Sequence, residues 1–268
     1  MGAHLVTIVT TQSNDWPIWW DSIGDGDPVL LLNGLSSPSG TWFRLRRVLA
    51  ERFRVLTIDN RGTGLTGAPP GHYPIAVFAQ DALAVLDAAG VDRVHVVGHS
   101  MGGLIAQELA LEAPDRVRSL VLAGTHVGVP HARADELTAG PQLVAAGALP
   151  PDERIPALNA MLYAPSTPAV LIAEDEAVRA AQPTSAEGYQ GQLNGSLSWE
   201  RLAELPALTM PTLVLHGALD RIVPLSAGER LAAALPCSEL TVLPNAAHAL
   251  FTDAEAEAAA LVAAFLRQ

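Results

Sequence analysis

The sequence predicts an α/β fold in which helices flank a mostly parallel, twisted sheet of about eight strands. Several short runs are apolar at every position, as in residues 29–32, and this pattern is typical of strands covered on both faces. Amphipathic stretches separate these runs, and such an alternation favours right-handed crossovers and a parallel sheet. The 268 residues, of which 49% are hydrophobic, suffice for one large domain or two small ones.

The predicted elements alternate in order along the chain. The first two strands, 5–11 and 18–23, are expected to form an antiparallel pair at one edge of the sheet. The remaining strands are predicted at 29–32, 54–58, 94–97, 120–122, 212–215 and 240–243. Amphipathic helices are expected near 41–51, 75–89, 102–113, 226–235 and 254–266.

One long stretch, residues 129–206, interrupts this alternation. It has no strand pattern, prolines recur in it, and short helical segments fall between them. We expect a helical cap inserted after the sixth strand into a core domain of residues 1–128 and 207–268. Ligands of open α/β sheets bind beyond the carboxyl ends of the strands, where this insertion leaves and returns. The alternative is a variable excursion without a role.

Charge and composition exclude several functions. The chain has 16 basic and 28 acidic residues, a formal net charge of −12, and every basic residue is Arg. An acidic surface repels phosphate backbones, so no nucleic-acid partner is expected. Without Lys there is no Schiff base and no Walker-type phosphate site. A small-molecule substrate is the expected partner.

Cysteine usage and hydropathy indicate the compartment. The single Cys237 cannot form an intramolecular disulfide or a cysteine-based zinc cluster, which favours a reducing environment. No apolar run approaches the ~18 residues of a membrane span, and the first ten residues lack the pattern of a secretory signal. We therefore expect a cytoplasmic protein with no membrane partner, as a monomer or a homodimer.

A Gly-His-Ser-Met-Gly motif at 98–102 is the strongest indication of chemistry. It directly follows the predicted strand 94–97 and precedes a predicted helix. A serine on such a turn is held in a strained backbone conformation, with its hydroxyl pointing up from the sheet. We therefore predict Ser100 as a nucleophile, with the helix N-terminus favouring the negative charge that develops nearby.

A serine nucleophile needs a general base, which is usually histidine. Among the eight histidines, His248 lies in a loop after the last predicted strand, at the same sheet edge as Ser100. His95 and His216 lie within strands and are expected in the core, whereas His99 is fixed inside the turn. His248 is therefore the predicted base.

A carboxylate is expected to orient the imidazole of the base. Asp220 lies just past a strand end at the same sheet edge. Asp253 follows His248 closely but is expected to cap the last helix, and Asp59 is expected to order the loop 60–64. Asp220 is therefore the predicted acid.

An oxyanion hole completes the predicted catalytic site. Backbone N–H groups preset where charge develops in a tetrahedral intermediate stabilise it. The Met101 N–H, immediately after the nucleophile, is one expected donor. The second is expected from the loop after the third strand, at the Leu35 N–H, because Gly34 gives that backbone freedom.

These residues together resemble the α/β-hydrolase family over nearly the whole chain. The order Ser100, Asp220, His248 matches the nucleophile–acid–base order of that family. Its landmarks are matched by the segments 30–34, 59–64, 98–103, 211–217 and 246–248. The resemblance implies the α/β-hydrolase fold and a Ser-His-Asp triad.

Among the subgroups of the family, the chain is most similar to small capped esterases, lactonases of the enol-lactone type and cofactor-free haloperoxidases. These subgroups need no metal and no cofactor, so none is expected here. Asn33 stands where the family usually has His, and Leu65 where a Ser usually follows the Arg-Gly-x-Gly loop. Because Ser100 occupies the nucleophile position, the resemblance argues against haloalkane dehalogenases and epoxide hydrolases, which place Asp there.

The predicted function is a serine hydrolase that cleaves a carboxylic ester or lactone of a small, largely apolar substrate through an acyl-enzyme. The alternative is a cofactor-free, non-hydrolytic enzyme on the same fold, such as a haloperoxidase or perhydrolase, an oxygenase, a lyase or a natural-product cyclase. In that case His248 acts on the substrate and Ser100 only binds it. A non-catalytic ligand-binding protein is the third possibility.

Substrate contacts are expected from loops at the active edge and from the cap. The residues expected to make them are Gly34, Ser36, Trp42, His126, Val127, Met161, Leu162 and Leu250. Further cap candidates for the pocket wall are Leu158, Tyr163, Leu193 and Trp199, although residues at helical spacing more often belong to a core.

Overall fold

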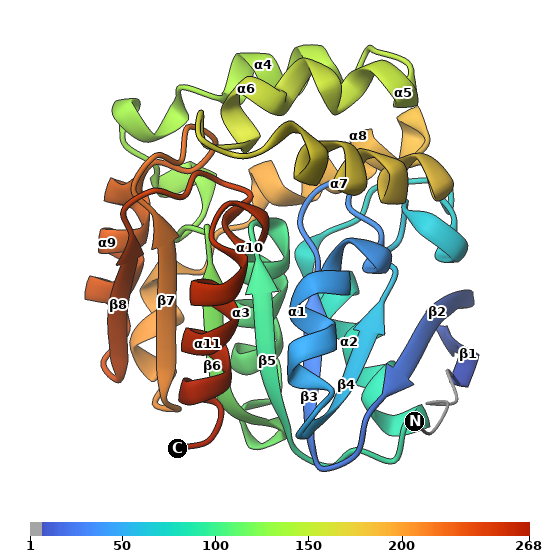
Figure 1. Cartoon of the computed structure of the whole chain (residues 1–268). Helices are drawn as coiled ribbons and strands as arrows, with labels where there is room; N and C mark the ends of the chain where they lie inside the picture. Colours follow the sequence, from blue (N-terminus) through green and yellow to red (C-terminus); the bar gives the residue numbers. More distant parts are fainter. Residues whose placement is uncertain (1–6) are drawn as a thin grey trace.

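The computed structural model describes residues 7–268, so Leu5 and Val6 of the predicted first strand lie outside the described residues. Eight strands form one sheet in the order β1-β2-β4-β3-β5-β6-β7-β8 (Figure 1). Strands β3 to β8 pair in parallel, whereas β1 with β2 and β2 with β4 pair antiparallel. The predicted fold class is confirmed. The strands are β1 (Thr7–Ser13), β2 (Trp16–Ile23), β3 (Asp27–Leu32), β4 (Phe53–Ile58), β5 (Val94–His99), β6 (Val117–Ala123), β7 (Thr212–Gly217) and β8 (Ser238–Leu243).

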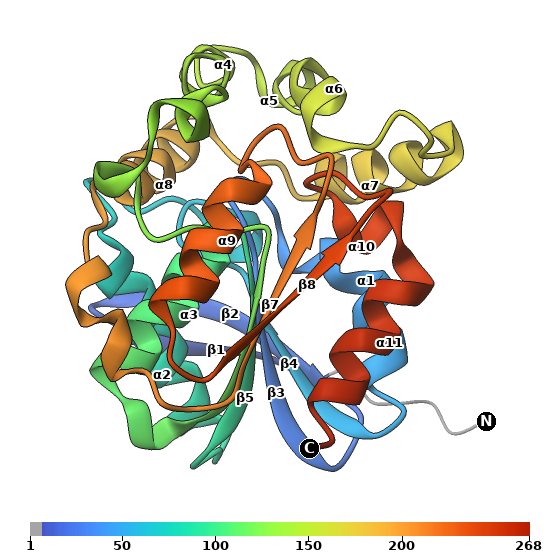
Figure 2. The same cartoon turned by 90° about the vertical axis from the view of Figure 1, so that its left-hand side faces the viewer.

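Helices cover both faces of the sheet (Figure 2). On one face lie α2 (Ile75–Ala88), α3 (Met101–Glu112) and α9 (Leu225–Ala234), and on the other α1 (Phe43–Leu49) and α11 (Glu255–Phe265). Successive residues of a strand point to opposite faces, so the continuous apolar runs supply both cores. In β3, for example, Leu30 packs on the α2 side and Leu31 on the α1 side.

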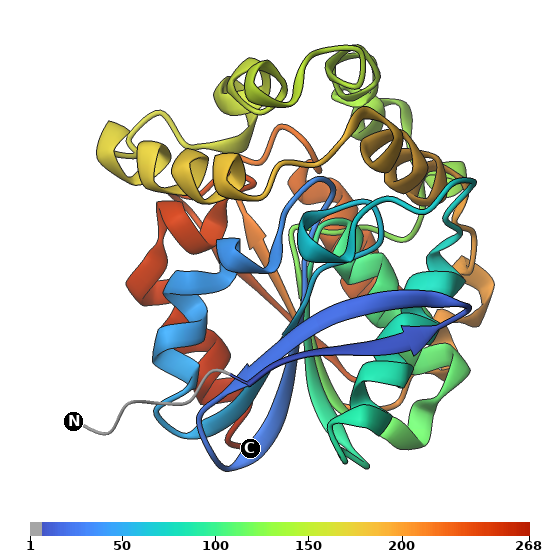
Figure 3. The same ribbon diagram turned by 90° about the vertical axis from the view of Figure 1, so that its right-hand side faces the viewer.

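The antiparallel pair β1–β2 crosses one edge of the sheet (Figure 3). Its register on the parallel part is set by β2 against β4, where Trp20 is opposite Ile58. Both side chains are buried in the core on the α2 side. The edge position predicted for the first two strands is therefore confirmed.

Between β6 and β7 the chain forms only helices and turns, and this inserted segment (residues 129–206) lies over the carboxyl ends of the parallel strands (Figures 1 and 2). Its helices α7 and α8 have 13 residues each, longer than the short helices expected. The prolines do not interrupt them, because Pro168 precedes α7, and Ser185 caps α8 by accepting a hydrogen bond from Gly188 N–H (3.1 Å). The α-helices of the segment are α4 (Gly140–Ala146), α5 (Pro151–Arg154), α6 (Asn159–Leu162), α7 (Ala169–Ala181) and α8 (Ala186–Ser198).

The last predicted helix, 254–266, corresponds to α11 (Glu255–Phe265), and a separate short helix precedes it. The short helix α10 (Leu250–Asp253) ends before α11, and Ala254 between them is not helical (φ −131°, ψ 45°). Asp253 therefore does not cap α11, contrary to the prediction. Its carboxylate instead accepts hydrogen bonds from Ala247 N–H (2.7 Å) and Ala164 N–H (3.2 Å), which joins the loop before α10 to the inserted segment.

Within residues 7–268 every helix is too short or too polar to cross a lipid bilayer. Short 3-10 helices lie between the other elements. The 3-10 helices are Ser39–Trp42, Gly64–Thr66, Pro114–Arg116, Val129–His131, Ala134–Leu137, Pro156–Leu158 and Leu202–Ala207.

Candidate active site

Ser100 lies on a tight turn between β5 and α3. Its backbone has φ 56° and ψ −121°, a conformation that costs a residue with a side chain of the order of 1–3 kcal/mol. Three hydrogen bonds hold it there. The Ser100 N–H donates to Ala123 O (2.9 Å), and the Ser100 carbonyl accepts from Gly103 N–H and from the Thr125 hydroxyl (2.8 Å each). Contacts with β6, with α3 and with the loop after β6 therefore hold the strained conformation that the motif predicts.

The flanking glycines allow this turn because the backbone passes too close for side chains. A Cβ atom at Gly102 would lie 2.0 Å from Leu32 O, and one at Gly98 would lie 2.3 Å from Gly102 O. Both contacts are well inside van der Waals distance with backbone atoms, which cannot turn away. The spacing of glycines around Ser100 thus follows from the packing of α3 against β3 and β5.

His248 and Asp220 meet at the carboxyl edge of the sheet. His248 Nδ1 and Asp220 Oδ2 are 2.8 Å apart, and both side chains are almost fully buried. The other oxygen, Asp220 Oδ1, accepts hydrogen bonds from the N–H groups of Ile222 and Val223 (2.8 Å each). Burial raises the pKa of Asp220, but the His248 charge and these hydrogen bonds outweigh burial and hold it below its ordinary value. Asp220 is therefore an anion that accepts the Nδ1 proton.

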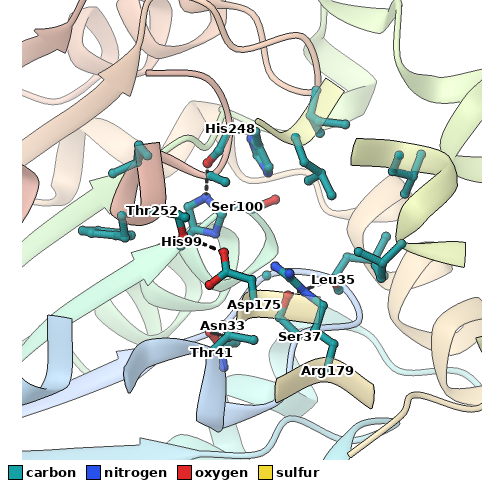
Figure 4. Close-up of a pocket in the computed structure, with 18 of the residues that line it drawn as sticks. Asn33, Leu35, Ser37, Thr41, His99, Ser100, Asp175, Arg179, His248 and Thr252 are labelled. Carbon is teal, nitrogen blue, oxygen red and sulfur yellow. Dashed lines mark hydrogen bonds between the residues drawn. The ribbon is translucent and has the colours of Figure 1, made fainter. Parts of the chain in front are cut away.

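His99 lies beside this pair and stays neutral. Its Nε2–H donates to the His248 carbonyl (2.9 Å), and the two rings have centroids 4.7 Å apart (Figure 4). Burial, and then the nearby His248 charge, lower the pKa of His99 to about 3. His99 thus supports the His248 backbone, in agreement with the expectation that it is fixed within the turn.

The loop after β3 approaches Ser100 closely. A Cβ atom at Gly34 would lie 3.0 Å from Ser100 Cβ, so this backbone lies directly against the serine. Within residues 7–268, the N–H groups of Leu35 and Met101 have no hydrogen-bond acceptor. The Asn33 side chain donates to Pro38 O (2.7 Å) and so closes the loop on itself. Leu35, directly after Gly34, and Met101, directly after Ser100, thus have N–H groups free to donate beside the serine.

Two cavities meet at Ser100, and Leu35, Leu143 and Ile222 also line both. The first cavity includes His248 as well (Figure 4). Of the residues predicted from the sequence, the first cavity is lined by Gly34, Trp42, Leu158, Leu162 and Leu250, and the second by Met101, His126 and Leu193.

His126 reaches the second cavity as a neutral side chain. Its Nδ1 accepts a hydrogen bond from Gly128 N–H (2.9 Å). Burial, and then the nearby His248 charge, lower the pKa of His126 to about 4. It can therefore contact a substrate as a neutral group at neutral pH.

Ser36, Val127 and Met161 do not line either cavity, contrary to the predictions for them. The cap candidates Tyr163 and Trp199 do not line them either, and both are buried, in line with the alternative that they belong to a core. The Ser36 N–H donates to a glutamine of α8 (2.8 Å), and Val127 belongs to the core on the α2 side. Met161 packs between two small apolar clusters. The Tyr163 hydroxyl donates to an aspartate of α7 (3.1 Å), and the Trp199 indole to a glutamate of α3 (2.8 Å). Packing or hydrogen bonds therefore keep these residues out of the two cavities.

Several site residues were not predicted. Gly124 has φ +52°, and a Cβ atom there would lie 3.5 Å from both Asp220 Oδ2 and His248 Nδ1. Asp175, Arg179 and Thr252 line the first cavity as a polar group, and α7 supplies two of them. A glycine shortly after a predicted strand could have indicated Gly124. Nothing in the sequence of α7 indicates that its polar side chains face the cavity.

The family model described as "alpha/beta hydrolase fold" matches residues 27–255. The chain belongs to the α/β-hydrolase family. A protein of Azorhizobium caulinodans named "Putative carbamate hydrolase RutD" is 33% identical over 247 residues, which cover 89% of this chain and 90% of that protein.

Two solved structures of this α/β-hydrolase fold extend the comparison. A hydrolase from Pseudomonas aeruginosa is 28% identical with a TM-score of 0.82, covering 99% of both chains. A thermophilic esterase from Thermogutta terrifontis is 25% identical with a TM-score of 0.85, covering 98% of both chains. These relatives support a hydrolase on the α/β-hydrolase fold. Among the described residues, no group of three or more His, Cys, Asp or Glu side chains is arranged to hold a metal ion.

Proposed function

We propose that this α/β-hydrolase is a serine hydrolase that cleaves a carboxylic ester or lactone through an acyl-enzyme. His248 Nε2 takes the proton of the Ser100 hydroxyl as Oγ attacks the carbonyl carbon. The oxyanion accepts hydrogen bonds from the N–H groups of Leu35 and Met101. His248 then gives the proton to the leaving alcohol oxygen, and the C–O bond breaks. A water activated by His248 releases the carboxylic acid and frees Ser100.

The single observation that carries the proposal is the hydrogen bond between His248 Nδ1 and Asp220, at a cavity that also contains Ser100. Because Asp220 is anionic and accepts this bond, the proton of a neutral His248 lies on Nδ1. Nε2 is then unprotonated and able to act as a base. Within the described chain the Ser100 hydroxyl forms no hydrogen bond, and such bonds commonly form only when substrate is present.

Carbamate hydrolysis is a second candidate, favoured by the name of the relatives that are 33% identical. A carbamate carbonyl carries nitrogen on one side and oxygen on the other, and Ser100 would attack it in the same way. The residues and their roles are then unchanged, and only the group on the acyl carbon differs.

Turnover of a neutral ester by a Ser100→Ala variant tests the proposal. With p-nitrophenyl butyrate, we expect kcat to fall by about 10⁴-fold or more, as it does when a member of a catalytic triad is removed. Ser37→Ala is the matched control, because it removes a hydroxyl that lines the same cavity. If Ser100→Ala retained most of the turnover, His248 would act directly on the substrate, as in the non-hydrolytic alternative.

A further inference from the structure

Arg179 extends from α7 into the cavity that contains Ser100 (Figure 4). Its Nη1 donates to the Tyr163 hydroxyl (2.9 Å), and its Nε is buried without a hydrogen-bond partner. Within residues 7–268, no carboxylate oxygen lies within 4.0 Å of its guanidinium, although ion pairs occupy many other arginines. In a chain with a net charge of −12, this cation faces the pocket without a counterion.

Asp175, which lies one helical turn before Arg179 on α7 and lines the same cavity, is already engaged. It accepts hydrogen bonds from Arg44 (3.2 Å), Tyr163 (3.1 Å) and Thr252 (2.7 Å). Arg44 is its ion-pair partner and also pairs with Glu174 and Glu255. Arg179 is joined to Asp175 only through the Tyr163 hydroxyl, so among the described residues no carboxylate contacts Arg179 directly.

A partly buried cation without a counterion is unfavourable, because burial removes water and the single hydrogen bond to a neutral hydroxyl replaces only part of it. Guanidinium groups are matched in shape to carboxylates, which accept two parallel N–H donors. The positive charge of Arg179 also reaches the catalytic centre, since it is among the causes that lower the pKa of His99. An anionic group of a ligand would supply both the missing charge and the missing acceptor.

We propose that Arg179 binds a carboxylate of the substrate while the scissile carbonyl lies at Ser100. This inference rests on the proposed hydrolase function and adds a substrate class to it: half-esters of dicarboxylic acids. The apolar side chains of Leu158 and Leu162 line the same cavity and would contact the aliphatic chain between the two groups. The largely apolar substrate expected from the sequence thus gains one charged end.

Paired substrates separate this role from a structural one. The probes are monomethyl esters of the dicarboxylic acids from succinic to suberic, each paired with the methyl ester in which isopropyl replaces the carboxylate. In Arg179→Gln we expect KM for the preferred half-ester to rise about 10- to 100-fold, the loss typical of a hydrogen-bonded charge pair. KM for its isopropyl partner should change by less than about twofold, within the range of a surface substitution.

Two controls sharpen the comparison. Arg52→Gln removes one positive charge from an exposed position just before β4, at the opposite end of the parallel strands, and should leave both KM values unchanged. Tyr163→Phe removes the hydrogen bonds of the hydroxyl to Arg179 and Asp175 but keeps both charges. It should retain the preference for the half-ester, whereas a merely structural role for Arg179 predicts that Tyr163→Phe and Arg179→Gln weaken both esters alike.

Binding without turnover distinguishes failure of this inference from failure of the proposed function. Calorimetry on Ser100→Ala should detect the preferred half-ester, with the Kd raised about 10- to 100-fold in Ser100→Ala/Arg179→Gln. If that dependence held but Ser100→Ala still turned over esters, the serine mechanism would be wrong and the carboxylate site would stand. If Arg179→Gln affected both members of each pair equally, the carboxylate site would be refuted and the hydrolase would stand.

Discussion

Replacement of Asp220 by Asn tests how the acid controls the base. Asp220 Oδ1 accepts two backbone N–H groups, from Ile222 and Val223, and Oδ2 faces His248 Nδ1. An asparagine amide would keep its oxygen on the two N–H donors, because an NH₂ group there would face protons. Its NH₂ group would then point at His248 and could only donate to Nδ1.

This reversal moves the histidine proton to the wrong nitrogen. A neutral His248 with Nδ1 as an acceptor carries its proton on Nε2, where the proposed mechanism needs an unprotonated base. Loss of the correct tautomer costs about 10⁴-fold in kcat in a serine triad, which corresponds to about 5.4 kcal/mol of transition-state stabilisation at 1.36 kcal/mol per tenfold. KM should change far less, because Asp220 lies behind His248 and does not line either cavity.

The assay is the kinetics of p-nitrophenyl butyrate hydrolysis by wild type and Asp220→Asn, with thermal unfolding as a check on the fold. Asp87→Asn is the control, because Asp87 is an exposed carboxylate paired with Arg116 (2.8 Å). We expect Asp87→Asn to have wild-type kcat. A folded Asp220→Asn enzyme with kcat within about tenfold of wild type would refute the assignment of tautomer and base.

Three further predictions concern the surroundings of the triad. Asp253→Ala removes the acceptor of Ala247 N–H, so it should lower the free energy of unfolding by about 1–3 kcal/mol and reduce kcat. An unchanged free energy in urea unfolding together with an unchanged kcat would contradict this. His99→Gln should reduce acid destabilisation. The pKa of His99 is about 3 in the folded chain and ~6.5 when unfolded, so between those values only the unfolded state binds the proton, and stability falls as pH falls. Between pH ~6.5 and ~4.5 the loss in wild type should exceed that in His99→Gln by about 2 kcal/mol, measured by urea unfolding. Equal losses would exclude His99 as the cause. Gly102→Ala, with a Cβ atom 2.0 Å from Leu32 O, should destabilise the fold by about 3 kcal/mol or more, and wild-type stability would disprove the close-approach argument.

The strands were predictable because each carries its own signal. A run such as residues 29–32 needs apolar neighbours on both faces, and only the interior of a covered sheet supplies them. The turn at Ser100 was equally local, since strand, glycines and helix are contiguous. His248 and Asp220 follow strand ends, so their meeting at one edge of the sheet follows from the parallel topology.

Residues whose roles depend on distant partners could not be predicted in this way. Asp253 directly precedes the predicted helix 254–266, and nothing local indicates that its carboxylate turns away from the helix start. The carboxylate instead accepts the N–H groups of Ala247 and Ala164, and the latter is 89 positions away in the sequence. Tertiary hydrogen bonds here outweigh the local capping preference.

The polar wall of the first cavity was missed for the same reason. Asp175 and Arg179 lie four positions apart on a helix, a pattern that equally describes a solvated face. Their roles depend on a contact that is distant in the sequence. Arg44, 131 positions from Asp175, forms an ion pair with that carboxylate, and Arg179 lines the cavity without one. Side-chain direction within the inserted segment likewise separates Leu162, which lines the cavity, from Met161, which does not.

Covalent labelling by a fluorophosphonate, located by mass spectrometry of the intact chain and of its peptides, tests the central claim most directly. We expect one adduct per folded chain, on Ser100, and no adduct in Ser100→Ala. Labelling of His248→Gln should be much slower, because the hydroxyl reacts only when the imidazole takes its proton. An adduct on another residue, or equal labelling of wild type and Ser100→Ala, would contradict it.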